Sequence, residues 1–247
     1  MALLEHFGYV EMMALRSQMR SLFDIDRPQT FEGAAQRVAR LFRDELLDEN
    51  GDPACALVRV YKTHPFQQLD LDLQDFARSI EPEADSIPEL RCLTLVATTG
   101  QEPGWNSRLA SKGHRAIPLS SVEAVERAPM VARLIQQLGI PIADVVRPER
   151  GLLLDTDQTA QGVFFVPQAA GSPYIVAQDE FVVPYGITSV IGFGGLIASG
   201  DLVAAILFSK VPVNDAVATQ FKVIGLNFKL AMLSFAFKPL FEDARAF

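Results

Sequence analysis

The sequence is poor in the residues that most often carry metal or redox chemistry. Its 247 residues include only three histidines and two cysteines. His6, His64 and His114 lie far apart and form no His-x-x-x-His pair, so we predict no metal site. Cys55 and Cys92 each lie in or beside an expected strand, where isolated cysteines are usually small core residues. We therefore expect neither a disulfide nor a metal pair.

Runs of positive charge and long apolar stretches are also missing. The chain has 22 Lys and Arg against 30 Asp and Glu, a net charge of −8. This acidic balance argues against nucleic acid and anionic membranes as partners. The apolar runs stop well short of the ~20 residues that span a bilayer, and the start, MALLEHFGYVEMM, lacks the basic segment of a secretion signal. We therefore expect a cytoplasmic protein.

The usual signatures of nucleotide binding and acyl transfer are absent as well. Gly192, Gly194 and Gly195 resemble part of a dinucleotide fingerprint, but Ile197 stands at the third glycine position and a strand follows instead of a helix. No Gly-x-Ser-x-Gly elbow occurs. The glycines are expected to mark a bulge, or a wall left open for a neighbouring side chain or ligand. The sequence assigns no catalytic residue, and the cofactor is unknown.

Apolar residues, by contrast, make up 49% of the chain. Two nearly continuous apolar runs, Ile187–Ile197 and Leu202–Val211, flank the small-residue turn Ala198–Asp201. This pattern predicts a hairpin whose two faces are both covered, as in the central strands of a layered domain. We expect it near the centre of the sheet.

The remaining periodicities predict a single α+β domain. It has a central antiparallel sheet of about five or six strands and helices on both faces. Pro129 interrupts one predicted helix and should kink or break it. The two long terminal helices should lie close together on one side. Other strands are expected at Ala56–Thr63, Cys92–Thr98, Leu152–Leu154 and Val163–Val166, and long helices at Met1–Phe23, Thr30–Leu46, Val122–Leu138 and Asn214–Phe237.

The predicted C-terminal helix carries two apolar lines on nearly opposite faces. The first line is Val217, Phe221, Ile224, Phe228 and Phe235. The second line is Val223, Leu226, Leu230, Leu233 and Phe237. One line can cover the sheet, while the other leaves an exposed patch on a monomer. We therefore expect a homodimer with the second line in its interface; burial on all sides within one domain is the alternative.

The segment VVPYGITSVIGFGGLIASGDLVAAILFSKVPV, residues 182–213, resembles the closing sheet of GAF domains. These domains are small-molecule sensor modules of bacterial signalling proteins. As in that family, a tyrosine-containing loop precedes an apolar strand, a small-residue turn and a second strand that leads into the last helix. The resemblance divides the chain into an N-terminal helix for dimerisation or linkage, residues 1–29, and a GAF-like sensory domain, residues 30–247. Neither the cyclic-nucleotide pattern of some GAF domains nor the cysteine environment that attaches bilins is recognisable.

The resemblance also implies a pocket between the sheet and the segments 100–138 and 166–185. A small-molecule ligand would occupy it, and an output domain or partner protein would receive the signal. The implied protein is a non-catalytic ligand-binding domain in signal transduction. A small-molecule enzyme using the same cavity and a ligand-free dimerisation scaffold are the alternatives. By position, the candidate ligand-binding residues are Trp105, Arg108, His114, Tyr174, Tyr185, Ser189 and Phe193.

Trp105 and Arg108 allow two interpretations within that pocket. An indole ring and a guanidinium group can stack on and clamp an anionic ligand. They can equally cap the edge of the hydrophobic core. The sequence alone leaves both interpretations open.

Overall fold

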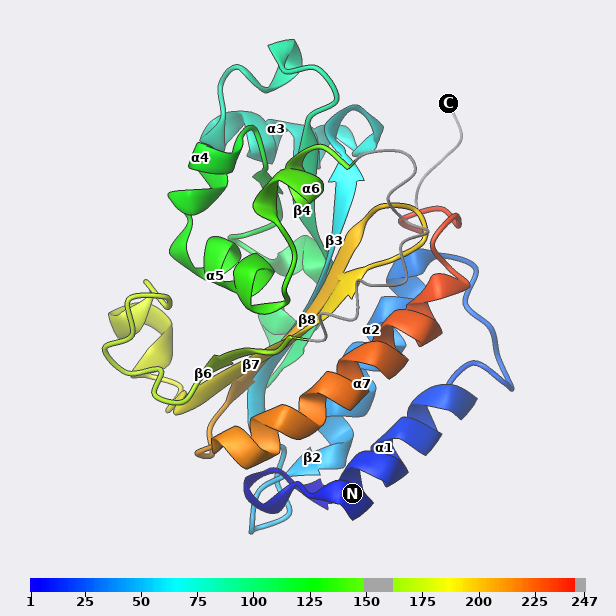
Figure 1. The fold of residues 1–247 in the computed structure, drawn as a ribbon, viewed down its shortest axis with the longest axis vertical. Coiled ribbons are helices and arrows are strands. Elements are labelled where there is room, and N and C mark those ends of the chain that lie inside the picture. Colours follow the sequence, from blue (N-terminus) through cyan, green and yellow to red (C-terminus); the bar gives the residue numbers. More distant parts are fainter. Residues whose placement is uncertain (149–161, 243–247) are drawn as a thin grey trace.

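The computed structural model describes residues 1–148 and 162–242, which form an α+β fold around one main antiparallel sheet (Figure 1). The six strands follow the order β5-β4-β3-β8-β7-β6. The predicted fold class is confirmed, while the expected strand Leu152–Leu154 lies outside the described residues. The strands are β3 Cys55–Pro65, β4 Arg91–Gly100, β5 Ala116–Pro118, β6 Phe164–Val166, β7 Ser189–Leu196 and β8 Leu202–Ser209.

The predicted hairpin is formed by β7 and β8, which pair antiparallel along their whole length. All eight residues of β8 are buried, because β3 and β7 flank it and helices cover both faces. Gly200 turns the chain between the two strands with a φ of +79°, a conformation that glycine adopts without strain. The nearly continuous apolar pattern of the two runs thus has the expected cause.

Two helices, α2 Phe31–Glu45 and α7 Asp215–Leu233, cover one face of the sheet, and α1 Tyr9–Ser21 packs on them (Figure 1). Thr30 caps α2, since its side chain accepts a hydrogen bond from the Gly33 amide at 3.1 Å. The ring of Phe7, just before α1, stacks on Phe221 of α7 with centroids 5.1 Å apart. The two terminal helices therefore lie together on one side, as predicted. We call these helices the helical layer.

The first helix is shorter than its sequence pattern predicts. Residues Ala2–Leu3 form strand β1, which pairs in parallel with β2, Leu46–Leu47, in a separate two-stranded sheet. A 3-10 turn over Leu4–His6 follows, and α1 begins only at Tyr9. The apolar residues at the start of the chain therefore form a strand and a turn, although their spacing is also compatible with a helix.

The other face of the sheet carries α4 Val122–Glu126, α5 Pro129–Gln137 and α6 Ile142–Val146, together with the segment 166–187 (Figure 1). Pro129 begins α5 and separates it from α4, which confirms the predicted break. We call this side the lid face.

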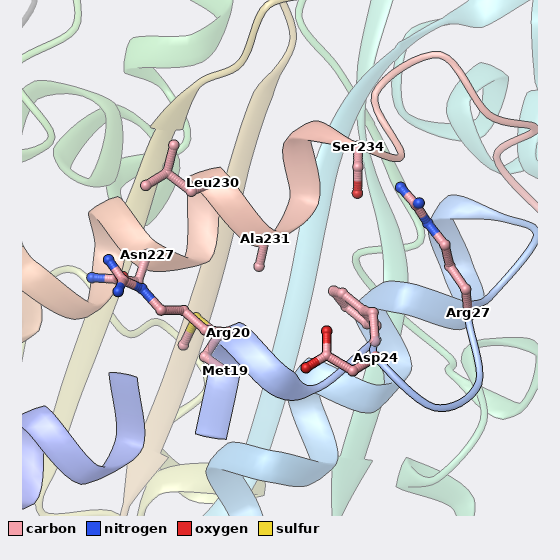
Figure 2. Close-up of a pocket in the computed structure, with 9 residues that line it drawn as sticks. Met19, Arg20, Asp24, Arg27, Asn227, Leu230, Ala231 and Ser234 are labelled. Carbon is pink, nitrogen blue, oxygen red and sulfur yellow. The ribbon is translucent and has the colours of Figure 1, made fainter. Parts of the chain in front are cut away.

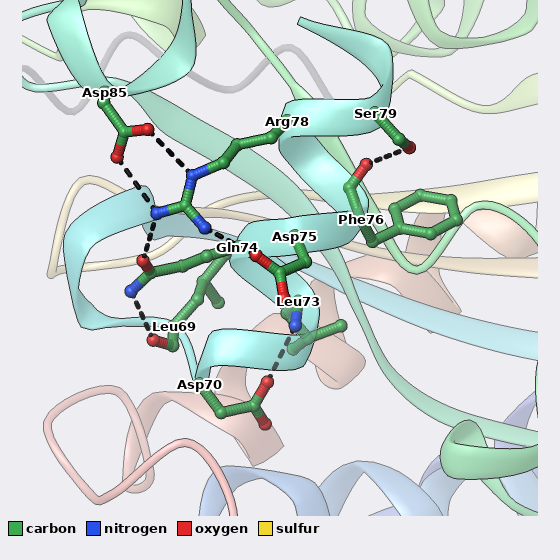
Figure 3. A network of polar contacts seen from close by, with 9 residues as sticks. All are labelled: Leu69, Asp70, Leu73, Gln74, Asp75, Phe76, Arg78, Ser79 and Asp85. Carbon is green, nitrogen blue, oxygen red and sulfur yellow. Dashed lines mark hydrogen bonds and ion pairs between the residues drawn. The ribbon is translucent and has the colours of Figure 1, made fainter. Parts of the chain in front are cut away.

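Helix α3, Leu71–Ile80, lies against β5 and is fixed by a polar network (Figure 3). Asp70 caps the helix by accepting from the Leu73 amide at 3.0 Å. Arg78 donates to Asp85 at 2.8 Å and to Asp75 at 2.7 Å. The exposed Asp72, also on α3, pairs with Arg115, so this helix anchors the segment between β4 and β5.

None of the helices in the described residues is long and apolar enough to cross a membrane.

Candidate functional site

The structure divides the predicted ligand-binding residues between the two faces of the sheet. Phe193 is completely buried in the helical layer, with its ring centroid 5.1 Å from that of Phe42 and 5.5 Å from that of Phe221. Ser189 lies four residues earlier on β7 and therefore on the same face. Its hydroxyl donates to the Val211 carbonyl at 3.0 Å. Ser189 and Phe193 are therefore structural here and share no pocket with the lid-face candidates, contrary to the prediction.

The lid face does bring two of the predicted residues together. Trp105 and Tyr185 have ring centroids 4.5 Å apart, and Phe181 lies 5.6 Å from Trp105. Phe181 also meets Phe208 of β8 edge-on at 5.0 Å. We call these four rings the aromatic cluster. Tyr174 lies elsewhere on this face, beneath the guanidinium group of Arg133, which is 5.5 Å from its ring.

A hydrophobic cluster lines the lid face, where the pocket was predicted. Gly192, in β7, allows Leu134 of α5 and Phe164 of β6 to approach so closely that a Cβ there would lie 2.9 Å from the Leu134 side chain. The glycines of β7 thus serve close packing, which was one of the two interpretations of the motif. Ser189 and Phe193 do not belong to a lid-face pocket, and the pocket itself stays a prediction.

One hollow in the described residues lies between the C-terminal end of α1 and the outer side of α7 (Figure 2). Its volume is about 300 Å³. Arg20 and Asn227 are seen at one end, and Asp24 and Arg27 at the other. The lining residues are Met19, Arg20, Phe23, Asp24, Arg27, Asn227, Leu230, Ala231 and Ser234.

Arg108 binds neighbouring parts of the chain and is not free to clamp a ligand. Its Nε donates to the Glu32 carboxylate at 2.6 Å, and its guanidinium carbon lies 3.6 Å from the centre of the Phe241 ring. Only 8% of Arg108 is exposed. In the same region the Phe31 and Glu32 amides donate to the Pro239 and Leu240 carbonyls, both at 2.9 Å. Arg108 therefore fastens the C-terminal segment 239–242 to the start of α2.

A different arginine lies on the lid face. Arg59 of β3 pairs in register with Ile206, a member of the lid-face cluster. Its guanidinium group donates to the Tyr61 hydroxyl at 3.4 Å and to the Ser111 hydroxyl at 3.3 Å. His114 has a φ of +57°, and its pKa is lowered by desolvation and by the charge of Arg59. The Ser111 hydroxyl donates to the Gly113 carbonyl and not to His114, so Ser111 and His114 are not arranged as a nucleophile and its base.

The two cysteines are core residues, as predicted. Cys55 is 1% exposed and Cys92 is completely buried. Burial raises the pKa of each thiol to about 12, so neither is a thiolate at neutral pH. Of the histidines, His6 shares an exposed cluster with Glu5 and Glu49, whose ligand atoms lie within 4.8 Å of one another. Exposed groups of this kind are common without a bound ion, and the prediction of no metal site stays a prediction.

No protein-family model and no curated protein matches this chain. Among solved structures, a weak match is found. It is the chromophore-binding domain of an unusual bacteriophytochrome from R. palustris, with 13% sequence identity and a TM-score of 0.38. The match covers 93% of this chain and 64% of that one, so the chain spans less than two thirds of the neighbour's length. At this level of similarity no function passes from one protein to the other.

A buried charge cluster at the turn of the hairpin was not predicted. Asp201 pairs with Lys62 of β3 and with Arg91 of β4, and the Ser199 hydroxyl donates to its carboxylate at 2.6 Å. Lys62 and Asp201 are 4% and 5% exposed. The signal in the sequence is a lysine inside the apolar strand ALVRVYKT. Its partner is 139 residues away, and no local pattern indicates that distance.

Proposed function

We propose that this chain is a GAF-like, non-catalytic sensory or regulatory domain that binds a small molecule on its lid face and passes the occupancy to its C-terminal end. One observation carries the proposal: the segment between β4 and β5 reaches both places. Its Trp105 belongs to the aromatic cluster and its Ser111 contacts Arg59, while Arg108, between them, holds the C-terminal segment.

The spacing within this segment gives the coupling a physical basis. Trp105, Arg108 and Ser111 are three residues apart, and two short 3-10 turns, Pro103–Trp105 and Arg108–Ala110, hold them. A displacement of this segment by a ligand must therefore move Arg108. A hydrogen bond to a charged group contributes about 1.5–3 kcal/mol, and every ~1.4 kcal/mol changes a population ratio tenfold. Weakening the contacts of Arg108 is enough to release the C-terminal segment.

The surface of α7 supports assembly as a homodimer. The first apolar line is buried, whereas Leu230, Leu233 and Phe237 of the second line are 55%, 41% and 81% exposed. Val223 and Leu226 are half-buried. Burying a Leu or Phe side chain contributes roughly 1.5–3 kcal/mol, so a second copy packed on this line would gain substantially. The pairing would place the two C-terminal segments in one assembly.

The N-terminal residues 1–29 would join such an assembly as part of the same body. Met12, Leu15 and Met19 of α1 belong to the hydrophobic cluster of the helical layer. Val10, on the outer side of α1, is 72% exposed and extends the apolar surface. We propose that residues 1–29 flank the sensory domain and contribute to the interface, and that an output domain or partner protein receives the signal.

A thermal-shift screen of metabolites with the full chain tests the proposal. A ligand at one hundred times its dissociation constant stabilises the native state by about 2.7 kcal/mol. We expect at least one compound to raise the melting temperature and to be recovered chemically unchanged after incubation. Turnover of that compound would establish the enzyme alternative. A screen without any stabilising compound would refute ligand sensing and leave the dimerisation scaffold.

A further inference from the structure

Two buried polar atoms without partners lie opposite each other on β3 and β4. Arg59 and Thr98 are paired in the antiparallel register, so their side chains project from the same face of the sheet. Nε of Arg59 and Oγ1 of Thr98 are both buried, and neither has a hydrogen-bond partner among residues 1–148 and 162–242. Buried polar groups are nearly always satisfied, and each exception calls for a physical cause. Here the Arg59 Nε–H and the Thr98 hydroxyl are two potential donors at paired positions of β3 and β4.

Arg59 also has an unbalanced charge. Within the described residues Arg37, Arg78, Arg91, Arg108 and Arg115 each pair with a carboxylate, whereas the partly buried Arg16, Arg43 and Arg133 do not. Arg59 pairs with no carboxylate there, although it is partly buried. Its two hydrogen bonds, to Tyr61 and Ser111, are long and go to uncharged hydroxyl oxygens. Desolvating a guanidinium group without an anion is costly.

The side chains around this pair are apolar. On the lid face Arg59 stands across from Ile206, and Leu57, two residues along β3, stands across from Phe208 of the aromatic cluster. Residues two apart on a strand are ~7 Å apart. The Arg59 and Thr98 donors therefore lie beside a surface of aromatic and aliphatic side chains on the same face of the sheet. A ligand that meets both features has a charged end and a flat apolar body.

We infer that Arg59 and Thr98, with Ser111 beside them, form an anion subsite that takes the carboxylate of a small aromatic or aliphatic acid. Because both donor atoms are buried, the segment that carries Ser111 must move aside for the ligand to enter. One carboxylate oxygen then accepts from Arg59 Nε–H and from the Thr98 hydroxyl, and the apolar body lies toward the aromatic cluster. This inference rests on the proposed function, because it names the ligand class for the lid face. It also links the ligand to the segment that carries Arg108, since the Ser111 hydroxyl contacts Arg59.

Benzoate is the probe for this subsite, with acetate and inorganic phosphate as comparisons. Trp105 is the single tryptophan of the chain, so its fluorescence reports on the aromatic cluster without labelling. We expect benzoate to change this fluorescence saturably in the full chain and to raise the melting temperature. Acetate should bind more weakly, because it offers the same carboxylate without the ring.

Arg59→Met tests the role of the guanidinium, because it keeps the length of the side chain and removes its charge and donors. Losing a hydrogen bond to a charged group should weaken benzoate binding by about tenfold or more. Thr98→Val, which keeps the shape of the side chain, should weaken it less. Arg133→Met is the matched control: Arg133 also lies on the lid face, over Tyr174, and its replacement should leave benzoate affinity unchanged.

Three results would overturn the inference. They are unchanged benzoate affinity in Arg59→Met, binding of phosphate in preference to benzoate, and no binding of any of the three anions to the wild-type chain. The metabolite screen separates this failure from that of the proposed function. If a compound from the screen binds the Arg59→Met variant as tightly as the wild type, the sensor proposal holds with a different binding site. If no compound binds, both the sensor proposal and the anion subsite are refuted.

Discussion

Asp201 is the single negative charge shared by two buried cations in the described residues, and replacing it should destabilise the fold severely. Asp201→Asn keeps the shape of the side chain and leaves Lys62 and Arg91 without their carboxylate. Breaking a buried ion pair on one side costs about 3–5 kcal/mol, because an uncompensated charge remains in the interior. Burial and the charge of Arg91 lower the pKa of Lys62 to about 7, so Lys62 can lose its proton when Asp201 is replaced, and we expect the lower part of this range.

Urea denaturation at neutral pH measures this loss, with Trp105 fluorescence and far-UV circular dichroism as independent probes. Domains are usually stable by only about 5–15 kcal/mol, so the midpoint should fall markedly. Asp75→Asn is the control, because Asp75 pairs with Arg78 at the surface with 74% of its side chain exposed. Such pairs contribute about 0–1 kcal/mol.

A double variant isolates the charge effect. Adding Lys62→Met to Asp201→Asn removes one of the two uncompensated cations and should recover part of the lost stability. If Asp201→Asn costs no more than Asp75→Asn, or if Lys62→Met adds its own full loss, the buried cluster does not stabilise the fold as described.

Three further predictions follow from the same structure. Burial, together with two neighbouring cations, lowers the pKa of His64 to about 3, whereas the unfolded residue titrates near 6.5. Below pH 6.5 the imidazole takes up a proton in the unfolded chain but stays neutral in the folded chain, so the unfolding free energy should fall by about 2 kcal/mol between pH 6.5 and 5. His64→Gln should make the unfolding free energy less dependent on pH in urea titrations. An unchanged pH dependence would contradict the assignment. Phe193→Ala should lower the unfolding free energy by about 3–5 kcal/mol, whereas a loss below ~1 kcal/mol would show that the ring is not core. Leu230→Glu combined with Leu233→Glu should convert a sedimenting dimer into a folded monomer; a wild-type chain that is already monomeric at micromolar concentration would refute the interface.

The fold could be predicted well because its signals are local. Two apolar runs around a small-residue turn indicate a covered hairpin, and β7 and β8 form it. Pro129 separates α4 from α5 where a break was expected, and Thr30 caps α2 at the expected start of that helix. Each of these features depends on residues adjacent in the chain.

The candidate site could be predicted only in part, because its composition depends on which face of the sheet each strand side chain points to and on contacts between residues far apart in the sequence. Phe193 and Trp105 were expected in one pocket, but the direction of a strand side chain depends on register, which places Phe193 on the opposite face. Arg108 was considered as a ligand clamp, yet Glu32 binds it across 76 residues. Arg59 is a charge in an apolar strand, but the unsatisfied Thr98 opposite it becomes visible only once β3 and β4 are paired.

Amide hydrogen exchange at Phe31 and Glu32 tests the central claim most directly. These amides donate to the Pro239 and Leu240 carbonyls, so their exchange reports whether the C-terminal segment is attached to α2. The full chain is measured with and without the stabilising compound from the metabolite screen. If ligand occupancy is coupled to the C-terminal segment, a saturating concentration of the compound should change the exchange rates of these two amides, although both lie on α2 and away from the lid face. Unchanged rates at saturation would show that occupancy is not passed to the C-terminal end.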